Sequence, residues 1–405
     1  MRIRQHILTI CCDGVWAHPA PNTLFVQIGD ADLDNTYWGG DHDIPTPRTS
    51  YQINATSPGT DAAAQAAAAF AACSALYANR ALTSSASASL ANTSYATTLL
   101  NHAQQLYTSP PMTQSHNRPI KLLYLRWDKR NSSDAYTQAV QVYQQQNLSR
   151  RLQADPVSNW DEKTPAVALL GLQIKTAYPN LTAGGAQPNW QSDLEGYFDR
   201  IVNGSGRGYL TGGGLLYYPG DSDEASLNPA LNAAMLLMRY ADSGLPSTSS
   251  KHSAYIEFAQ NQVDYVLGNN PMTVPYIVGM HPNSPANPHS ALATGASPAD
   301  IANIDTVPTQ EAYVLYGGVV GGPDAQDRFW DMRSDWVQNE VALDYVAPVL
   351  TLAARAIVEG TSDPWYTRLD VGSNEQRKPG GQPCDAALNV MDIFSNIFLI
   401  YDNLA

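Results

Sequence analysis

Apolar residues recur at three- and four-residue spacing along most of the chain, a pattern that is typical of amphipathic helices. One predicted helix starts at Thr60 and Asp61, which form a cap ahead of an alanine-rich run. In the last predicted helix, Pro348 occupies the first helical position and Gly360 follows the end. Further helices are predicted over residues 95–109, 134–148, 163–178, 228–244 and 252–270.

Long segments rich in Gly, Pro, Asn and Asp separate these helices, notably residues 29–59 and 280–309. A compact domain seldom carries loops of this length unless they have a function. Helices joined alternately by short and long loops predict an all-α fold, a helical barrel or toroid whose long loops form a substrate groove on one face. No sequence repeat of constant period is present, which disfavours a solenoid. The polar tail after residue 360 is predicted to be a linker or a strap.

Composition narrows the classes of partner. The chain has a net charge of −14 with 23 Lys plus Arg, which argues against nucleic acid and favours a neutral substrate. No uninterrupted apolar run approaches the ~20 residues that span a bilayer, so no membrane insertion is expected. The N-terminus is not a convincing signal peptide, yet several N-x-[ST] sequons favour secretion, and we expect a secreted monomer. The four cysteines, at 11, 12, 73 and 384, are too few for a disulfide framework.

The stretch "FWDMRSDWVQNEVALDY", residues 329–345, places acidic residues among aromatic rings. One interpretation is a solvated acidic turn with packing aromatics. The other is glycoside cleavage, which needs one protonated carboxylic acid and one carboxylate. Apolar rings and neighbouring carboxylates both raise the pKa of an acid, and aromatic faces stack on sugar rings. Residues alone leave both interpretations open.

A second cluster lies in residues 264–290, where His281 and His289 stand in a loop rich in Pro and Asn. Such a histidine is more often a surface residue, although a neutral imidazole can hydrogen-bond a sugar hydroxyl. The spacing fits no zinc motif, so no metal site is predicted.

In this order and separation, the two clusters resemble glycoside hydrolase family 9, the inverting cellulases with an (α/α)6 barrel. The motifs are "DYVLGNNP…VG…P…PH" in residues 264–289 and "LYGGVVGGPDAQDRFWDMRSDWVQNEV" in residues 315–341. The stretches "FVQIGDADLDNTYWGG" and "NWDEKTPAVALL" are also similar to family motifs. The matches run from about Ala17 to Gly360. They divide the chain into an unmatched segment 1–16, a catalytic domain 17–360 and a C-terminal tail 361–405.

The resemblance implies a role for individual residues. Glu340 matches the general acid of the family, Asp331 the acidic member of the same signature, and His289 a histidine that contacts substrate near the cleavage point. The candidate sugar platforms are Trp38, Trp160, Trp330 and Trp336. The implied activity is endo-β-1,4-glucanase, cleaving cellulose or a related β-glucan with inversion and without a required cofactor.

Several departures from the family pattern open alternatives. No paired-aspartate motif for the catalytic base is present in residues 1–16, where Asp13 lacks a second carboxylate. We therefore expect a barrel that is incomplete at the N-terminus, a chain with little activity and low stability, and a truncated or mis-spliced gene. The usual "PHHR" reads "PHSA", Asn35 stands where His is frequent, and Val346 replaces an asparagine.

Residues 113–130 are basic where the family usually has a calcium loop, so calcium is possible but not supported, with Asp161 as one remaining candidate ligand. The alternatives are a non-catalytic carbohydrate-binding pseudoenzyme, or a hydrolase of another β-linked polysaccharide.

Overall fold

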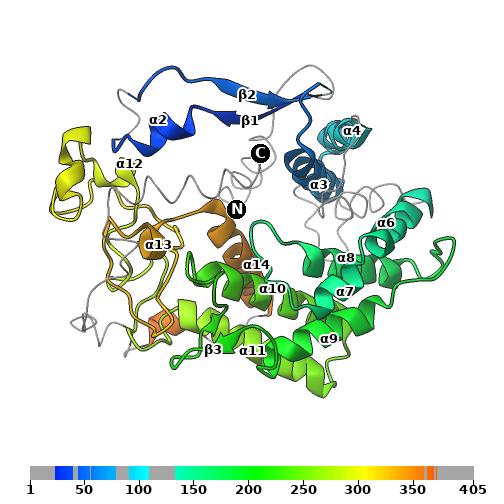
Figure 1. Ribbon diagram of the computed structural model, residues 1–405. Coiled ribbons are helices and arrows are strands. Elements are labelled where there is room, and N and C mark those ends of the chain that lie inside the picture. Colours follow the sequence, from blue (N-terminus) through cyan, green and yellow to red (C-terminus); the bar gives the residue numbers. More distant parts are fainter. Residues whose placement is uncertain are drawn as a thin grey trace. The chain divides into compact units, whose positions relative to one another are not determined.

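The computed structural model describes residues 23–39, 44–54, 56–78, 91–108, 133–359, 363–368 and 371. The expectations for residues 1–16, for 113–130 and for most of 361–405 lie outside these ranges. The described chain is mostly helical, and its only sheets are two antiparallel pairs of short strands (Figure 1). It forms two compact units, the first from Met1–Gly29 with Arg48–Tyr197, the second from Asp30–Pro47 with Phe198–Ala405.

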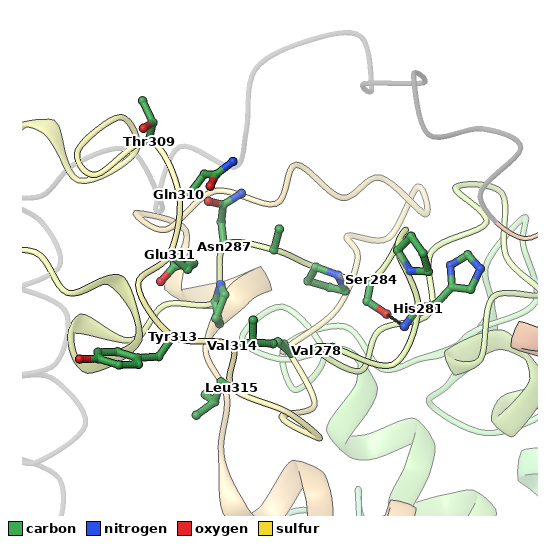
Figure 2. A pocket seen from close by; sticks show the side chains of 15 residues that line it. Val278, His281, Ser284, Asn287, Thr309, Gln310, Glu311, Tyr313, Val314 and Leu315 are labelled. Carbon is green, nitrogen blue, oxygen red and sulfur yellow. Dashed lines mark hydrogen bonds between the residues drawn. The ribbon is translucent and has the colours of Figure 1, made fainter.

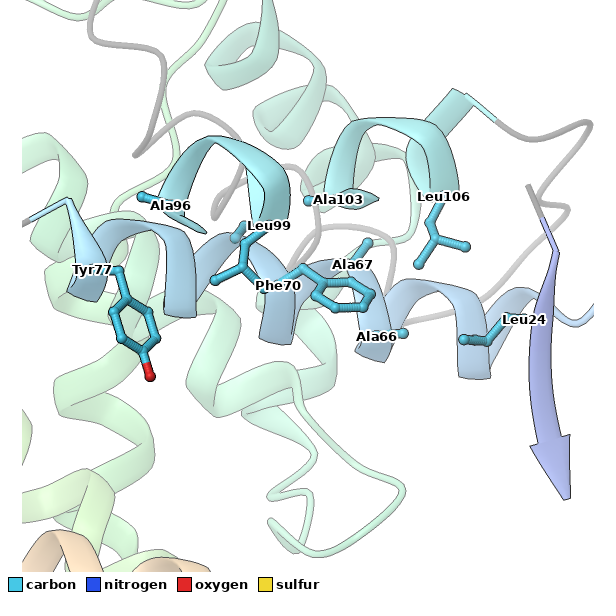
Figure 3. Close-up of a cluster of buried hydrophobic side chains, with 10 residues drawn as sticks. Leu24, Ala66, Ala67, Phe70, Tyr77, Ala96, Leu99, Ala103 and Leu106 are labelled. Atoms are coloured by element: carbon cyan, nitrogen blue, oxygen red, sulfur yellow. The ribbon is translucent and has the colours of Figure 1, made fainter. Parts of the chain in front are cut away.

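The first unit contains strands β1 (Leu24–Ile28) and β2 (Ser50–Ile53) and helices α3 (Thr60–Tyr77) and α4 (Thr93–Thr108). Alanines on α3 let α4 approach closely, and Phe70 and Leu99 fill the space between them (Figure 3). Cys73 of α3 is disulfide-bonded, and the other cysteines lie outside the described residues. The remaining helices that begin in this unit are α6 (Ser133–Gln145), α7 (Leu148–Gln153), α8 (Thr164–Ala177) and α9 (Trp190–Val202).

The second unit is built on α10 (Leu227–Gly244), which packs against α11 (Ser250–Val266) and α14 (Leu343–Glu359). Its shorter elements are α2 (Ala31–Asn35), β3 (Tyr209–Leu210), β4 (Leu216–Tyr217), α12 (Ala291–Thr294), η2 (Pro298–Asn303), α13 (Trp336–Asn339) and η3 (Trp365–Thr367). Between α12 and α14 the chain is mostly irregular. Buried side-chain hydrogen bonds therefore position this region, in place of regular secondary structure.

The helices predicted from the spacing of apolar residues are confirmed to within a few residues. Helices α7 and α9 and the short helices α2, α12 and α13 are additional. Two boundary predictions are wrong. Gly59 is the N-cap of α3, so Thr60 is already helical. Helix α14 begins at Leu343, so Pro348 lies inside it and not at its first position. The helix tolerates this proline because the Asn228 side chain of α10 donates to the Asp344 carbonyl, the hydrogen bond that Pro348 cannot make. In the described part of the chain, no helix is both long and apolar enough to cross a bilayer.

Gly171 of α8 lies against the Trp190 ring in the interior of the first unit, where there is little room for a side chain. A Cβ built on Gly171 would lie 2.9 Å from three ring carbons of Trp190. Trp190 is 3% exposed, and its ring also packs at 4.5 Å from Tyr143. We expect Gly171→Ala to lose about 1–2 kcal/mol of stability, because the overlap outweighs the gain in helix propensity. Denaturant unfolding followed by circular dichroism measures this loss. The control is Gly184→Ala, whose added methyl group meets nothing within 4 Å.

Candidate active site

Short backbone bridges place Glu340 at the end of α13. His289 pairs with Glu340 in parallel, and the His289 amide donates to the Asn339 carbonyl at 2.8 Å. On the other side, Val341 pairs antiparallel with Val320, which is fully buried. These bridges bring the two segments singled out in the sequence into direct contact and fix the backbones of Glu340 and His289.

Gly321 allows this close approach. A Cβ at Gly321 would lie 2.0 Å from the carbonyl oxygen of Val337, a backbone atom that cannot move aside. The Gly321 carbonyl accepts from the Leu227 amide at 2.9 Å, and the next amide, Gly322, donates to Gln338 at 3.0 Å. Gly321 therefore lets this segment of the chain lie directly against α13, while a Cβ at Gly322 would meet Leu227 of α10 at 2.4 Å.

Asp335 caps the helix that leads to Glu340. Its carboxylate accepts from the Gln338 amide at 2.9 Å, as an N-cap does. Burial raises the pKa of Asp335 to about 6, although the amides it accepts from lower it. Asp335 is fully enclosed, so it cannot reach a substrate. Its elevated pKa is therefore a consequence of burial, which outweighs the hydrogen bonds that cap α13.

Glu340 is half-buried and open to solvent on one side. Burial raises the pKa of its carboxyl, the charge of Asp344 raises it further, and a hydrogen bond from Tyr345 opposes them weakly. That bond is long, with 3.5 Å between the Tyr345 hydroxyl and Oε2. Within the described residues no lysine or arginine forms an ion pair with Glu340. These surroundings favour the protonated form of the carboxyl.

His289 is held as a neutral ring. Burial lowers the pKa of His289 more than its hydrogen bond to the Arg333 carbonyl raises it. Nδ1 lies 2.5 Å from that carbonyl oxygen, and a carbonyl only accepts, so we assign the proton to Nδ1. Nε2 is then left to accept a hydrogen bond. The indole of Trp38 packs 4.9 Å from the imidazole, centroid to centroid.

Asp331 anchors the loop that leads to His289. Its two oxygens accept from the amides of Ala286 at 2.9 Å and Asn287 at 3.0 Å, and from the Asn287 side chain at 3.2 Å. Burial raises the pKa of Asp331, and these amide donors oppose that shift. Its backbone has a positive φ of 47°, which an aspartate tolerates better than most residues.

Arg333 ties a second loop to the same turn. It is 1% exposed, its Nε donates to Glu311 at 2.6 Å, and its Nη1 donates to the carbonyls of Ile304 and Pro308. An arginine buried in this way is held by several acceptors at once, so the loop and the turn move together.

A pocket of about 370 Å³ lies between residues 278–288 and 309–315 (Figure 2). Asn287 and Gln310 both line it. His281, the other histidine singled out in the sequence, also lines this pocket, and its Nδ1 accepts from the Asn283 amide at 3.0 Å. Pro288 joins the pocket wall to His289.

The four tryptophans predicted as sugar platforms have different surroundings. Trp38 is 9% exposed and belongs to an apolar cluster with Ala296 and Ile304. Trp330 and Trp336 are half-buried and precede Glu340 in the same segment of the chain. The Arg328 guanidinium lies 5.1 Å from the Trp330 ring. Trp160 is 56% exposed and belongs to the first unit, between α7 and α8. The described residues contain no group of three or more His, Cys, Asp or Glu side chains that could hold a metal ion.

Comparison with known proteins decides the family. The sequence model described as "Glycosyl hydrolase family 9" matches residues 8–353. The chain belongs to glycosyl hydrolase family 9. An endoglucanase of Dictyostelium discoideum is 30% identical over 369 residues, covering 86% of this chain and 47% of that protein. The chain thus spans about half the length of the first curated relatives that it matches.

Solved structures of the family support the fold class. An endoglucanase from the termite Nasutitermes takasagoensis is 28% identical with a TM-score of 0.68, covering 85% of this chain and 76% of the termite chain. The cellulase Cel9M of C. cellulolyticum, solved with cellobiose, is 25% identical with a TM-score of 0.68, covering 85% and 75%. The expected fold class is confirmed, since the described chain is mostly helical and these neighbours are (α/α)6 barrels.

The raised pKa of Glu340 predicts a pH-dependent effect on stability. Below about pH 4.3, the pKa of glutamate in an unfolded chain, the Glu340 carboxyl is neutral in both the folded and the unfolded protein. At such a pH the full stabilising effect of its raised pKa on folding is present. As the pH rises, the unfolded chain ionises first and stability is lost until the folded carboxyl also ionises. We therefore expect Glu340→Gln to raise the thermal unfolding midpoint more at pH 7 than at pH 4. Equal shifts at both pH values, or the same behaviour in the exposed control Glu257→Gln, would contradict the assigned environment.

Proposed function

We propose that this chain carries the acid-catalysis site of an inverting endo-β-1,4-glucanase that cleaves cellulose or a related β-glucan. The observation that carries the proposal is the environment of Glu340, which is half-buried, has a raised pKa and has no cationic partner among the residues that the structure describes. The relatives support it, since they are named as endoglucanases and one neighbour was solved with cellobiose. We also place the activity outside the cell, because polymeric cellulose does not enter cells.

In the proposed reaction, Glu340 donates its proton to the glycosidic oxygen as the bond to the anomeric carbon breaks. Nε2 of neutral His289 accepts a hydrogen bond from a sugar hydroxyl and orients the ring. In inverting enzymes a second carboxylate, about 6.5–9.5 Å from the acid, activates water on the opposite face of the sugar. We assign that role to no described residue. For Asp331 we propose a positioning role, since both of its oxygens accept from the loop before His289.

Loss of the acid tests the proposal. The 405-residue chain, together with any longer natural form that contains it, is incubated with carboxymethyl-cellulose and assayed for reducing ends. Removal of a general acid costs about 10²–10⁴ in rate, so we expect Glu340→Gln to reduce kcat by this factor. Asp335→Asn removes a second carboxylate of the same segment. We expect a smaller loss of kcat from it, because Asp335 is enclosed and cannot reach the substrate. Unchanged kcat in Glu340→Gln would remove Glu340 from the mechanism.

Calorimetry with cello-oligosaccharides separates hydrolysis from binding alone. Product formation with both forms of the chain supports the hydrolase. Binding without product in every form supports a carbohydrate-binding pseudoenzyme instead.

The aromatic platform is tested at Trp330. We expect Trp330→Ala in the Glu340→Gln background to weaken cellotetraose binding roughly two- to twelvefold, as loss of ~0.5–1.5 kcal/mol of ring stacking implies. Trp365→Ala is a matched control, because Trp365 is also half-buried, with the Arg368 guanidinium 3.8 Å from its ring, but lies outside the segment of Glu340. Equal losses in the two variants would show that Trp330 is not a specific platform.

A further inference from the structure

Pro348 leaves a gap in the hydrogen bonding of α14. A prolyl nitrogen has no hydrogen, so the carbonyl four residues earlier, that of Asp344, has no donor within the helix. Asn228 of α10 supplies that donor. Its Nδ2 lies 3.2 Å from the Asp344 carbonyl oxygen and 3.0 Å from Oδ2 of the Asp344 carboxylate. One amide group therefore satisfies the backbone and holds the acidic side chain.

The orientation of the Asn228 amide is fixed by its neighbour one turn along α10. Asn232 donates from Nδ2 to the backbone carbonyl of Asn228 at 2.9 Å and to its Oδ1 at 3.3 Å. The oxygen end of the amide is thus occupied, and the nitrogen end faces Asp344. Asn228 is 3% exposed, so water does not readily compete for this bond.

Asp344 lies four residues after Glu340 in the chain, and its charge acts on the Glu340 carboxyl. After burial, the charge of Asp344 is the largest contribution that raises the pKa of Glu340. The other ionisable groups around Glu340 are the Tyr345 hydroxyl, His289 across the backbone bridge, and Glu224, whose charge acts on Tyr345. None of these described groups is a cation, so the position of the Asp344 carboxylate adds to the effect of burial on how strongly Glu340 holds its proton.

We propose that Asn228 is a positioning residue for the acid: it uses the hydrogen-bonding gap left by Pro348 to hold the carboxylate of Asp344 beside Glu340. The role of Glu340 as the acid rests on the proposed function. The geometric claim about Asn228 does not.

The test measures the ionisation of Glu340 directly, by carbon-13 NMR of labelled glutamate carboxyls, with the Glu340→Gln spectrum as assignment. In Asn228→Ala the carboxylate of Asp344 is released, and we expect the acid dissociation constant of Glu340 to rise roughly three- to tenfold. An Asp344→Asn variant should show at least the same rise. An unchanged dissociation constant in Asn228→Ala overturns the proposal.

Pro348→Ala separates the electrostatic role from a structural one. Alanine restores the amide hydrogen that bonds to the Asp344 carbonyl. The double variant Asn228→Ala, Pro348→Ala should therefore recover unfolding stability relative to Asn228→Ala, yet keep the increased dissociation constant. Recovery of both quantities would show that Asn228 only caps a carbonyl, and it would overturn the proposal. The double variant also keeps the test decisive if Asn228→Ala alone does not fold.

Failure of this inference is distinguishable from failure of the proposed function. The NMR titration needs no turnover, so a shifted titration in a chain without hydrolysis contradicts only the proposed function. An unshifted titration in a chain whose hydrolysis requires Glu340 contradicts only the inference.

Discussion

The hydrogen bond from the His289 amide to the Asn339 carbonyl joins two segments that are far apart in the sequence and contain little regular structure. All the chemistry described here depends on that junction. A loop without a helix or sheet must satisfy its buried polar groups with side chains. Asp331, Asp335 and Arg333 do this for the loops and turns around the site, and each is buried or half-buried at a fixed backbone position. Acidic and basic residues next to the candidate site therefore serve as scaffold.

Burial acts on the two central groups in opposite directions and prepares both. Removing water disfavours the charged form of any group, so it raises the pKa of the Glu340 carboxyl and lowers that of the His289 imidazole. Burial thus favours the uncharged forms of both the carboxyl and the imidazole, and no lysine or arginine among the described residues forms an ion pair with the carboxyl. The charge of Asp344 raises the pKa of Glu340 only as long as its carboxylate stays in place. Because Asn228 of α10 holds that carboxylate, the packing of α10 on α14 also influences the pKa of Glu340.

The sequence predicts the helices and the two site segments well, because both depend on local patterns. Spacing of apolar residues locates α10 and α11, and the motifs locate Glu340 and His289, which the structure brings together. What it does not predict depends on tertiary partners. Helix α14 starts earlier than the sequence predicts. Proline is expected in the first turn of a helix because it lacks an amide hydrogen, but here Asn228 of α10 supplies the missing donor. The burial of Trp38 likewise follows from Ala296 and Ile304, which local sequence does not connect to it.

The left-handed backbone of Asp331 has a consequence for how this position can evolve. Glycine would adopt the conformation freely but offers no acceptor to the amides of Ala286 and Asn287. Asparagine tolerates the conformation as well, yet it would turn an amide hydrogen toward at least one of those donors. Glutamate has the acceptors but adopts this backbone poorly and is longer by one methylene. Among these residues, aspartate alone combines two acceptor oxygens with tolerance of the left-handed backbone. Substitutions at this position are therefore disfavoured by folding, even without any selection on turnover.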